Sequence, residues 1–312
     1  MKDFLISTVR PDHWEQLCDE SGAFFSGGAW LDLLASSFKC RTLYVTNDTE
    51  GFSVSVFRGG PFHIGYLGFP VGGGVGKGSA AQTLVEIIGA ANNRHMPICI
   101  RIPVSAFGQS PQLDHPFESN PETAIEDLQA WSLARVSKNL RRDIRKAQRS
   151  GLDVSLANSS VNGKELYDIY AQTVKQHGGA IRYNAEYFHE LLGLARGNSR
   201  LRVLLAKQGN KVAGFAVTAR HGDTTCYLHG GASLEHRKLS PSDLLLHRAI
   251  CDAQHDGSQG FNLMASPEDQ PSLVRYKEKW GGTTRNLRTY TIVLRPSYQL
   301  FRLAEKIYRM IR

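Results

Sequence analysis

The same order of predicted elements occurs twice along this 312-residue chain, and that repetition constrains the fold more than any other feature. Each half shows three β-rich segments separated by turn residues, then a loop, a helical pattern and a further strand. In the first half these elements fall at 41–46, 52–58, 62–69, 79–95 and 97–104. In the second half they fall at 201–207, 211–221, 224–232, 242–256 and 260–264. The halves share no evident residue identity, so the duplication is one of elements.

A short helix at 272–280 and a last strand at 284–294 complete the second half. We therefore expect an α/β protein with mixed sheets and two similar halves. The chain is long enough for two domains of ordinary size, which we place at 1–135 and 136–312. The second domain would begin with a basic helix and end with an amphipathic helix.

Composition indicates a globular protein with a basic surface. Hydrophobic residues make up 41% of the chain and charged residues 21%, which suits a folded core. The net charge of +8 and the pI near 9.3 favour polyanionic partners, such as nucleic acid or an anionic membrane. The five cysteines lack a Cys-x-x-Cys pair, so we expect reduced thiols, no metal site and a cytoplasmic location. No apolar run reaches the ~20 residues that a membrane span needs.

The segment 137–151 predicts a basic helix between the halves. Ser137 and Gly151 suit its two caps. A narrow apolar stripe is flanked by six basic residues: Lys138, Arg141, Arg142, Arg145, Lys146 and Arg149. Such a face is either simply solvated or binds an anion. We take Arg141, Arg142 and Arg145 as candidates for binding RNA or another polyanion.

A second segment, 273–282, places Tyr276, Lys277 and Trp280 on a short helix that ends at two glycines. Together the two segments resemble the Fem-type aminoacyl transferases and their relatives described as acetyltransferases of exopolysaccharide clusters. Both groups share the GNAT fold, so the resemblance implies a tandem GNAT-like acyltransferase fold. It extends over most of the chain, because Phe24-Phe25-Ser26 with Trp30 is similar to the family's opening motif.

The resemblance also implies catalytic residues. Lys277 stands where the Fem-type pattern has a lysine, and its cation would stabilise the developing oxyanion. A single lysine on a helix is otherwise most often a solvated side chain. His229 shares a face of the strand 224–232 with Tyr227 by simple alternation, and it is a candidate base. A core histidine bonded to the backbone is an equal alternative.

The loop before the helix 242–256 is the expected donor site. Arg237, Ser240 and Ser242 have the spacing with which GNAT enzymes hold the pyrophosphate of coenzyme A at a helix N-terminus. Serines replace the usual glycines and Pro241 removes one N–H donor, which weakens a coenzyme A site. Capping of the helix by Ser240 or Ser242 is the alternative role.

The leading hypothesis is the transfer of an aminoacyl group from aminoacyl-tRNA to an amine-bearing cell-envelope precursor, without a cofactor. Arg182, Tyr183 and Tyr227 are the candidates for acceptor binding. One alternative is an N-acetyltransferase of exopolysaccharide biosynthesis that uses acetyl-CoA or another acyl-CoA. A second alternative is a non-catalytic binding protein of the same fold.

Residues 296–312 predict a terminal amphipathic helix. Tyr298, Phe301, Leu303 and Ile307 recur at three- and four-residue spacing, with basic residues between them. The helix either packs on its own domain or, through 297–312, contacts an anionic membrane surface.

Overall fold

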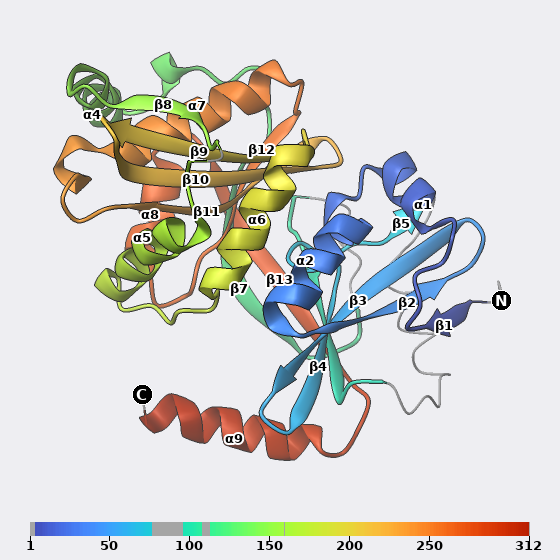
Figure 1. Ribbon diagram of the computed structural model, residues 1–312. Helices are drawn as coiled ribbons and strands as arrows, with labels where there is room; N and C mark the ends of the chain where they lie inside the picture. Colours follow the sequence, from blue (N-terminus) through green and yellow to red (C-terminus); the bar gives the residue numbers. More distant parts are fainter. Residues whose placement is uncertain (1–3, 77–95, 108–112, 159, 312) are drawn as a thin grey trace. The chain divides into compact units, whose positions relative to one another are not determined.

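The computed structural model describes residues 4–76, 96–107, 113–158 and 160–311 (Figure 1). Through their contacts the residues group into two compact units. Unit 1 comprises Met1–Ser119 and Asn286–Arg312, and unit 2 comprises Asn120–Arg285. The strands β7 (Phe117–Ile125) and β13 (Thr283–Val293) pass from one unit into the other. The predicted helix at 79–95 lies outside the described residues.

Unit 1 is a mixed sheet with short helices. Its strands follow the order β1-β2-β3-β4-β6-β13, and β5 pairs with β3. The first four strands form an antiparallel meander, β4 and β6 are parallel, and β13 is antiparallel to β6. Its other elements are β1 (Leu5–Ser7), α1 (Trp14–Ser21), η1 (Phe24–Ser26), α2 (Gly28–Phe38), β2 (Arg41–Thr46), β3 (Glu50–Gly59), β4 (Phe62–Leu67), β5 (Val75–Gly76), β6 (Cys99–Val104) and α9 (Tyr298–Ile311).

Unit 2 repeats this plan. Its strands follow the order β8-β9-β10-β11-β12-β7, with an antiparallel meander, a parallel β11–β12 pair and an antiparallel β7. Its elements are η2 (Leu133–Arg135), α4 (Lys138–Arg149), β8 (Asp153–Leu156), α5 (Gly163–Gln176), α6 (Ala185–Gly197), β9 (Leu201–Gln208), β10 (Lys211–His221), β11 (Thr224–Ala232), η3 (Arg237–Leu239), α7 (Pro241–His255), β12 (Gly260–Ala265) and α8 (Pro271–Glu278).

The predicted duplication and the mixed α/β fold are confirmed by this repeated strand order. The final strand of each order comes from the opposite part of the chain: β13 completes unit 1 and β7 completes unit 2. Unit 1 therefore combines residues from both ends of the chain, whereas each of the predicted domains, 1–135 and 136–312, is a continuous segment. The terminal helix α9, which we expected in the second domain, groups with unit 1.

Helices cover both faces of the unit 2 sheet (Figure 1). On one face, α4 and α7 enclose a core that includes Leu140, Ile144 and Leu245. On the other face, α5 contacts β11 and α6 contacts β9. The basic helix α4 thus has the predicted apolar stripe, and the Ser137 hydroxyl accepts from the Leu140 N–H as its N-cap. Each described helix is too short or too polar to span a membrane.

Candidate active site

The parallel strands β11 and β12 separate towards their carboxyl ends. They pair over Thr224–Cys226 and Gly260–Asn262, after which β11 continues to Ala232 and β12 to Ala265. An opening between parallel strands at their carboxyl ends is the usual place for a ligand in α/β sheets. The segments that follow the two strands carry the predicted donor loop and Lys277. The fold therefore brings these two predicted parts of the site to one end of the sheet.

A β-bulge in β11 turns Tyr227 and His229 to opposite faces of the sheet. The ladder with β10 shifts register between these two residues, which leaves Leu228 as an extra residue. Tyr227 packs on the core beneath α7, whereas the His229 ring packs against Tyr187 and Phe188 of α6. The expectation that both side chains share one face is wrong. The bulge also leaves a backbone amide outside the ladder, where it is a candidate oxyanion donor.

Lys277 is a buried residue of α8, with 6% of its surface exposed. Its ammonium donates to the carbonyl oxygens of Met264 and Ala265, at 2.8 and 3.2 Å. Burial lowers the pKa of Lys277 to about 7, and the Glu122 carboxylate partly opposes that shift. The side chain is therefore not a solvated surface lysine. Catalytic groups often have a pKa shifted towards neutral pH, as this amine does.

The end of β12 is distorted where it meets the Lys277 ammonium. Met264 has a φ of 65°, in the left-handed region that residues other than glycine seldom adopt. Asn262 holds this conformation, since its side-chain oxygen accepts from the Met264 N–H at 2.7 Å and its amide donates to Glu122 at 2.8 Å. The ladder with β7 shifts register between Asn262 and Ala265. Neither Asn262 nor Glu122 was predicted as a site residue.

The predicted donor loop forms η3 and the start of α7. Arg237 begins η3, Ser240 is the N-cap of α7 and Ser242 lies in its first turn. Ser240 has a left-handed φ of 59°, and its side chain makes no capping hydrogen bond. Capping by the Ser240 hydroxyl, the alternative role, is therefore absent. Pro241 occupies the first helical position and offers no N–H.

Asp243 places a carboxylate at the N-terminus of α7. The Tyr276 hydroxyl, one residue before Lys277, is hydrogen-bonded to it, and burial raises the pKa of Asp243. Tyr276 and Tyr227 pack against the same core cluster. This contact joins the first turn of α7 to α8, so the donor loop and the Lys277 helix are neighbours. A carboxylate at this end of a helix stabilises the helix but repels a bound pyrophosphate.

His229 lies in an aromatic cluster on the opposite face. Its Nε2 is 2.8 Å from the Tyr187 hydroxyl, and the Tyr183 ring is centred 4.5 Å from its own. Burial lowers the pKa of His229 to about 3, so the imidazole is neutral near pH 7. The structure thus brings together His229 and Tyr183, two predicted site residues. Tyr227 lies on the other face of the sheet. Arg182 is exposed, and its backbone N–H donates to the Tyr170 hydroxyl at 3.2 Å.

The basic helix α4 packs beside the donor loop. The Lys146 ammonium donates to the carbonyl oxygen of Lys238 in η3 at 2.7 Å. Arg145 is exposed, and Arg142 is exposed beside Asp143, 3.3 Å away. Arg141 is half-buried, and its Nε lacks a hydrogen-bond partner among the described residues. The exposed basic residues around the α7 N-terminus therefore include members of α4, η3 and the end of α8: Arg142, Arg145, Lys146, Arg237, Lys238 and Lys279.

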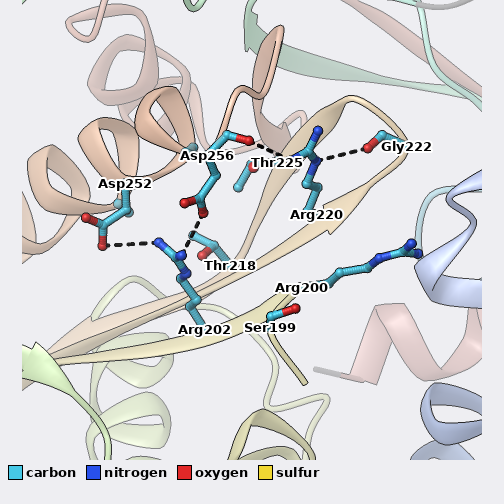
Figure 2. Close-up of a pocket in the computed structure, with 11 residues that line it drawn as sticks. Ser199, Arg200, Arg202, Thr218, Arg220, Gly222, Thr225, Asp252 and Asp256 are labelled. Carbon is cyan, nitrogen blue, oxygen red and sulfur yellow. Dashed lines mark hydrogen bonds and ion pairs between the residues drawn. The ribbon is translucent and has the colours of Figure 1, made fainter. Parts of the chain in front are cut away.

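A separate cavity lies at the other end of the unit 2 sheet (Figure 2). It has a volume of about 470 Å³, and none of the predicted site residues lines it. Arg202 pairs there with Asp252 and Asp256, at 3.7 and 2.7 Å. Arg220 donates to the carbonyl oxygens of Gly222 and Asp256. The two aspartates of the cavity wall are thus paired with Arg202, whereas Arg220 is held by carbonyl oxygens.

Comparison with known proteins agrees with this geometry. A family model described as an acetyltransferase (GNAT) domain matches residues 134–278, which contain α4, the donor loop and Lys277. The search for curated relatives found no match. Residues 134–278 therefore match a GNAT-type domain, which indicates that the protein is an acyltransferase.

Solved structures extend the likeness to the whole chain. FemX superposes with a TM-score of 0.65 at 13% identity, covering 95% of this chain and 99% of FemX. L-PGS from Bacillus licheniformis has a TM-score of 0.62 at 15% identity, covering 90% of this chain and 91% of that one. A tandem GNAT protein from the clavulanic acid biosynthesis pathway has a TM-score of 0.51 at 11% identity, with coverages of 93% and 98%. The expected tandem GNAT fold, similar to that of FemX, is thereby confirmed.

Proposed function

We propose that this acyltransferase moves an aminoacyl group from aminoacyl-tRNA to an amine acceptor. The observation that carries the choice of donor is the N-terminus of α7. Pro241 removes one N–H there, and the Asp243 carboxylate occupies the end of the helix that would hold a pyrophosphate. Those features disfavour coenzyme A. The likeness of the fold to FemX supports the same choice without fixing a substrate.

The positive charge around the site suits a large polyanion. It lies on the exposed outer side of α4 and η3, and the Lys146–Lys238 hydrogen bond holds these elements together. An RNA backbone can contact such a surface while its aminoacyl end enters between β11 and β12. A small phosphorylated donor would instead need its phosphate groups to be bound at the α7 N-terminus, within the site.

In the proposed reaction, the neutral acceptor amine attacks the ester carbonyl of the donor. The Lys277 ammonium and a bulge amide of β11 stabilise the oxyanion that develops. The tRNA hydroxyl leaves, and the proton of the amine is transferred to it or to solvent. His229 holds Tyr183 and Tyr187 in place rather than taking that proton, because a pKa of about 3 makes it a weak base. Arg182 and Tyr183 would then contact the acceptor from the α6 side.

We place the acceptor among amine-bearing cell-envelope precursors, and the protein in the cytoplasm with peripheral membrane contact. All five cysteines are free, which suits a reducing compartment. The alternative, N-acetylation with acetyl-CoA in exopolysaccharide biosynthesis, rests on the GNAT domain match alone.

Ligand binding tests the choice of donor. Deacylated tRNA should bind the full chain in an electrophoretic shift, and the double variant Arg142→Gln/Arg145→Gln should bind it roughly ten-fold more weakly. Its plot of log affinity against log salt should be shallower by about 2, since each lost phosphate contact removes roughly one unit. The control, Lys175→Gln/Arg196→Gln, removes two exposed charges from α5 and α6 and should bind as the unchanged protein does.

Acetyl-CoA provides the opposing arm. A ligand that binds only the folded state raises the melting temperature by mass action. A clear rise with acetyl-CoA, together with no binding of tRNA, would replace the aminoacyl-tRNA donor by the acyl-CoA alternative.

A further inference from the structure

The described side chains of helix α9 form two apolar faces, and one of these faces packs on the protein. Tyr298 and Phe301 lie against the cluster of Ile64, Ile98 and Cys99 in unit 1. The Phe301 ring is centred 5.7 Å from that of Phe62. These contacts fix the orientation of the helix on the β4–β6 part of its unit.

The second apolar face is exposed. Leu300, Leu303 and Ile307 have 64%, 57% and 49% of their surface accessible. Their spacing of three and four residues places them on one side of the helix, along about two turns. Single exposed leucines are common on protein surfaces, but an aligned group on one helix is a typical feature of an interaction site.

The segment that forms this helix is basic in sequence. Residues 295–312 contain five basic residues and one acidic residue, Glu305. Glu305 lies 3.6 Å from the half-buried Arg101, and Arg302 lies 3.0 Å from Glu118. These pairs tie the helix to its unit. Lys306 is exposed, and among the described residues it enters no ion pair within 4 Å.

We propose that α9 docks on the surface of a membrane that contains anionic phospholipids. A helix with an apolar face and basic residues beside it binds at the level of the headgroups, where its leucines enter the acyl boundary. Each basic residue near an anionic surface strengthens the binding roughly five-fold. A protein partner suits the face less well, since a stable interface takes about 20 residues on each side and this face offers three large apolar side chains.

Vesicle sedimentation tests the docking. The full chain should sediment with vesicles of equal parts phosphatidylglycerol and phosphatidylcholine, and much less with pure phosphatidylcholine. The triple variant Leu300→Ser/Leu303→Ser/Ile307→Ser should partition at least ten-fold less onto the mixed vesicles. Leu156→Ser/Leu234→Ser is the control, because both leucines are similarly exposed, at 56% and 52%, in unit 2. It should bind as the unchanged protein does.

A second variant separates lost docking from lost folding. Lys306→Glu leaves the apolar contacts of α9 intact and should weaken binding to the mixed vesicles by more than ten-fold, with an unchanged melting temperature. Failure of the full chain to bind mixed vesicles, or equal binding by the triple variant, would overturn the proposal. So would a dimer in light scattering that the triple variant converts to a monomer, because the face would then bind a second copy of the chain.

Discussion

The ammonium of Lys277 donates to the carbonyl oxygen of Met264 at 2.8 Å, and Met264 is held in a left-handed conformation by Asn262. The amine is thus fixed by carbonyl dipoles, and the Glu122 carboxylate raises its pKa without offsetting the effect of burial. Burial disfavours the cationic form of Lys277, and the resulting loss in the free energy of unfolding can be measured.

Stability against pH should reveal the lowered pKa of Lys277. The folded value is about 7 and the unfolded value about 10.5, so the unfolded chain binds more protons between these limits. Stability contributed by this group therefore rises as pH increases from about 7 to 10.5. We expect urea unfolding to show that Lys277→Met gains on the unchanged protein at pH 7 and loses that advantage by pH 10, by an amount on the order of a few kcal/mol. A constant difference between the two proteins would contradict the lowered pKa.

Activity should depend on the same titration in the opposite direction. If the Lys277 cation stabilises the oxyanion, kcat falls as pH rises through about 7. Glu122 raises the pKa of Lys277, so Glu122→Gln should move this falling limb to lower pH. Glu126→Gln is a control for the lost charge, since Glu126 pairs with Arg285 at the surface. A limb that stays in place in Glu122→Gln would show that another group titrates.

Acid should destabilise the protein through His229. Its folded pKa of about 3 lies below the ordinary value of 6.5, so the unfolded chain takes up a proton first as the pH falls. The stability due to the neutral imidazole is complete above pH 6.5 and is lost between 6.5 and about 3, by up to roughly 4 kcal/mol. Melting temperatures of His229→Gln should fall less steeply over this range. His221→Gln, whose histidine has a lowered pKa of about 4, should flatten the curve to a smaller extent.

Local patterns predicted most of the second half. The strands 211–221 and 224–232 match β10 and β11, because β-branched residues flank an evident turn at Gly222. The cap at Ser137 and the apolar stripe of α4 were likewise visible in the sequence. By contrast, β7 was missed, since Asn120 and Pro121 within it are typical of turns.

The site was harder to predict than the fold, because it depends on irregular backbone. Leu228 carries no signal for a bulge, yet the bulge separates Tyr227 from His229. The left-handed Met264 is equally unmarked, and it determines the partners of Lys277. Tyr187 could have been proposed, since it lies on a helix next to the predicted Tyr183. Its partner His229 is 42 residues away, and only the fold joins them.

A methyl group at Gly230 should disturb Tyr227. A Cβ there would lie 1.8 Å from the Tyr227 hydroxyl, far inside contact distance. Gly230→Ala should therefore cost about 1–3 kcal/mol in the free energy of unfolding, as overpacked cores do. Removing the hydroxyl with Tyr227→Phe should recover part of this loss, which a double-mutant cycle measures. Gly193→Ala in α6, where a Cβ meets nothing within 4 Å, should be neutral or slightly stabilising.

Replacing Ser240 by glycine should stabilise the protein. Ser240 has a φ of 59°, a conformation that is unfavourable for a residue with a Cβ, and its side chain makes no capping hydrogen bond that would offset this strain. Ser240→Gly should raise the free energy of unfolding by about 1 kcal/mol, measured by urea unfolding. Ser242→Gly, inside the first turn of α7, should instead lower it by roughly 0.5–1 kcal/mol. The Ser240→Gly variant should still show no rise in melting temperature with acetyl-CoA, because Pro241 and Asp243 remain. A shift with this single change would mean that Ser240 alone excludes coenzyme A from the α7 N-terminus.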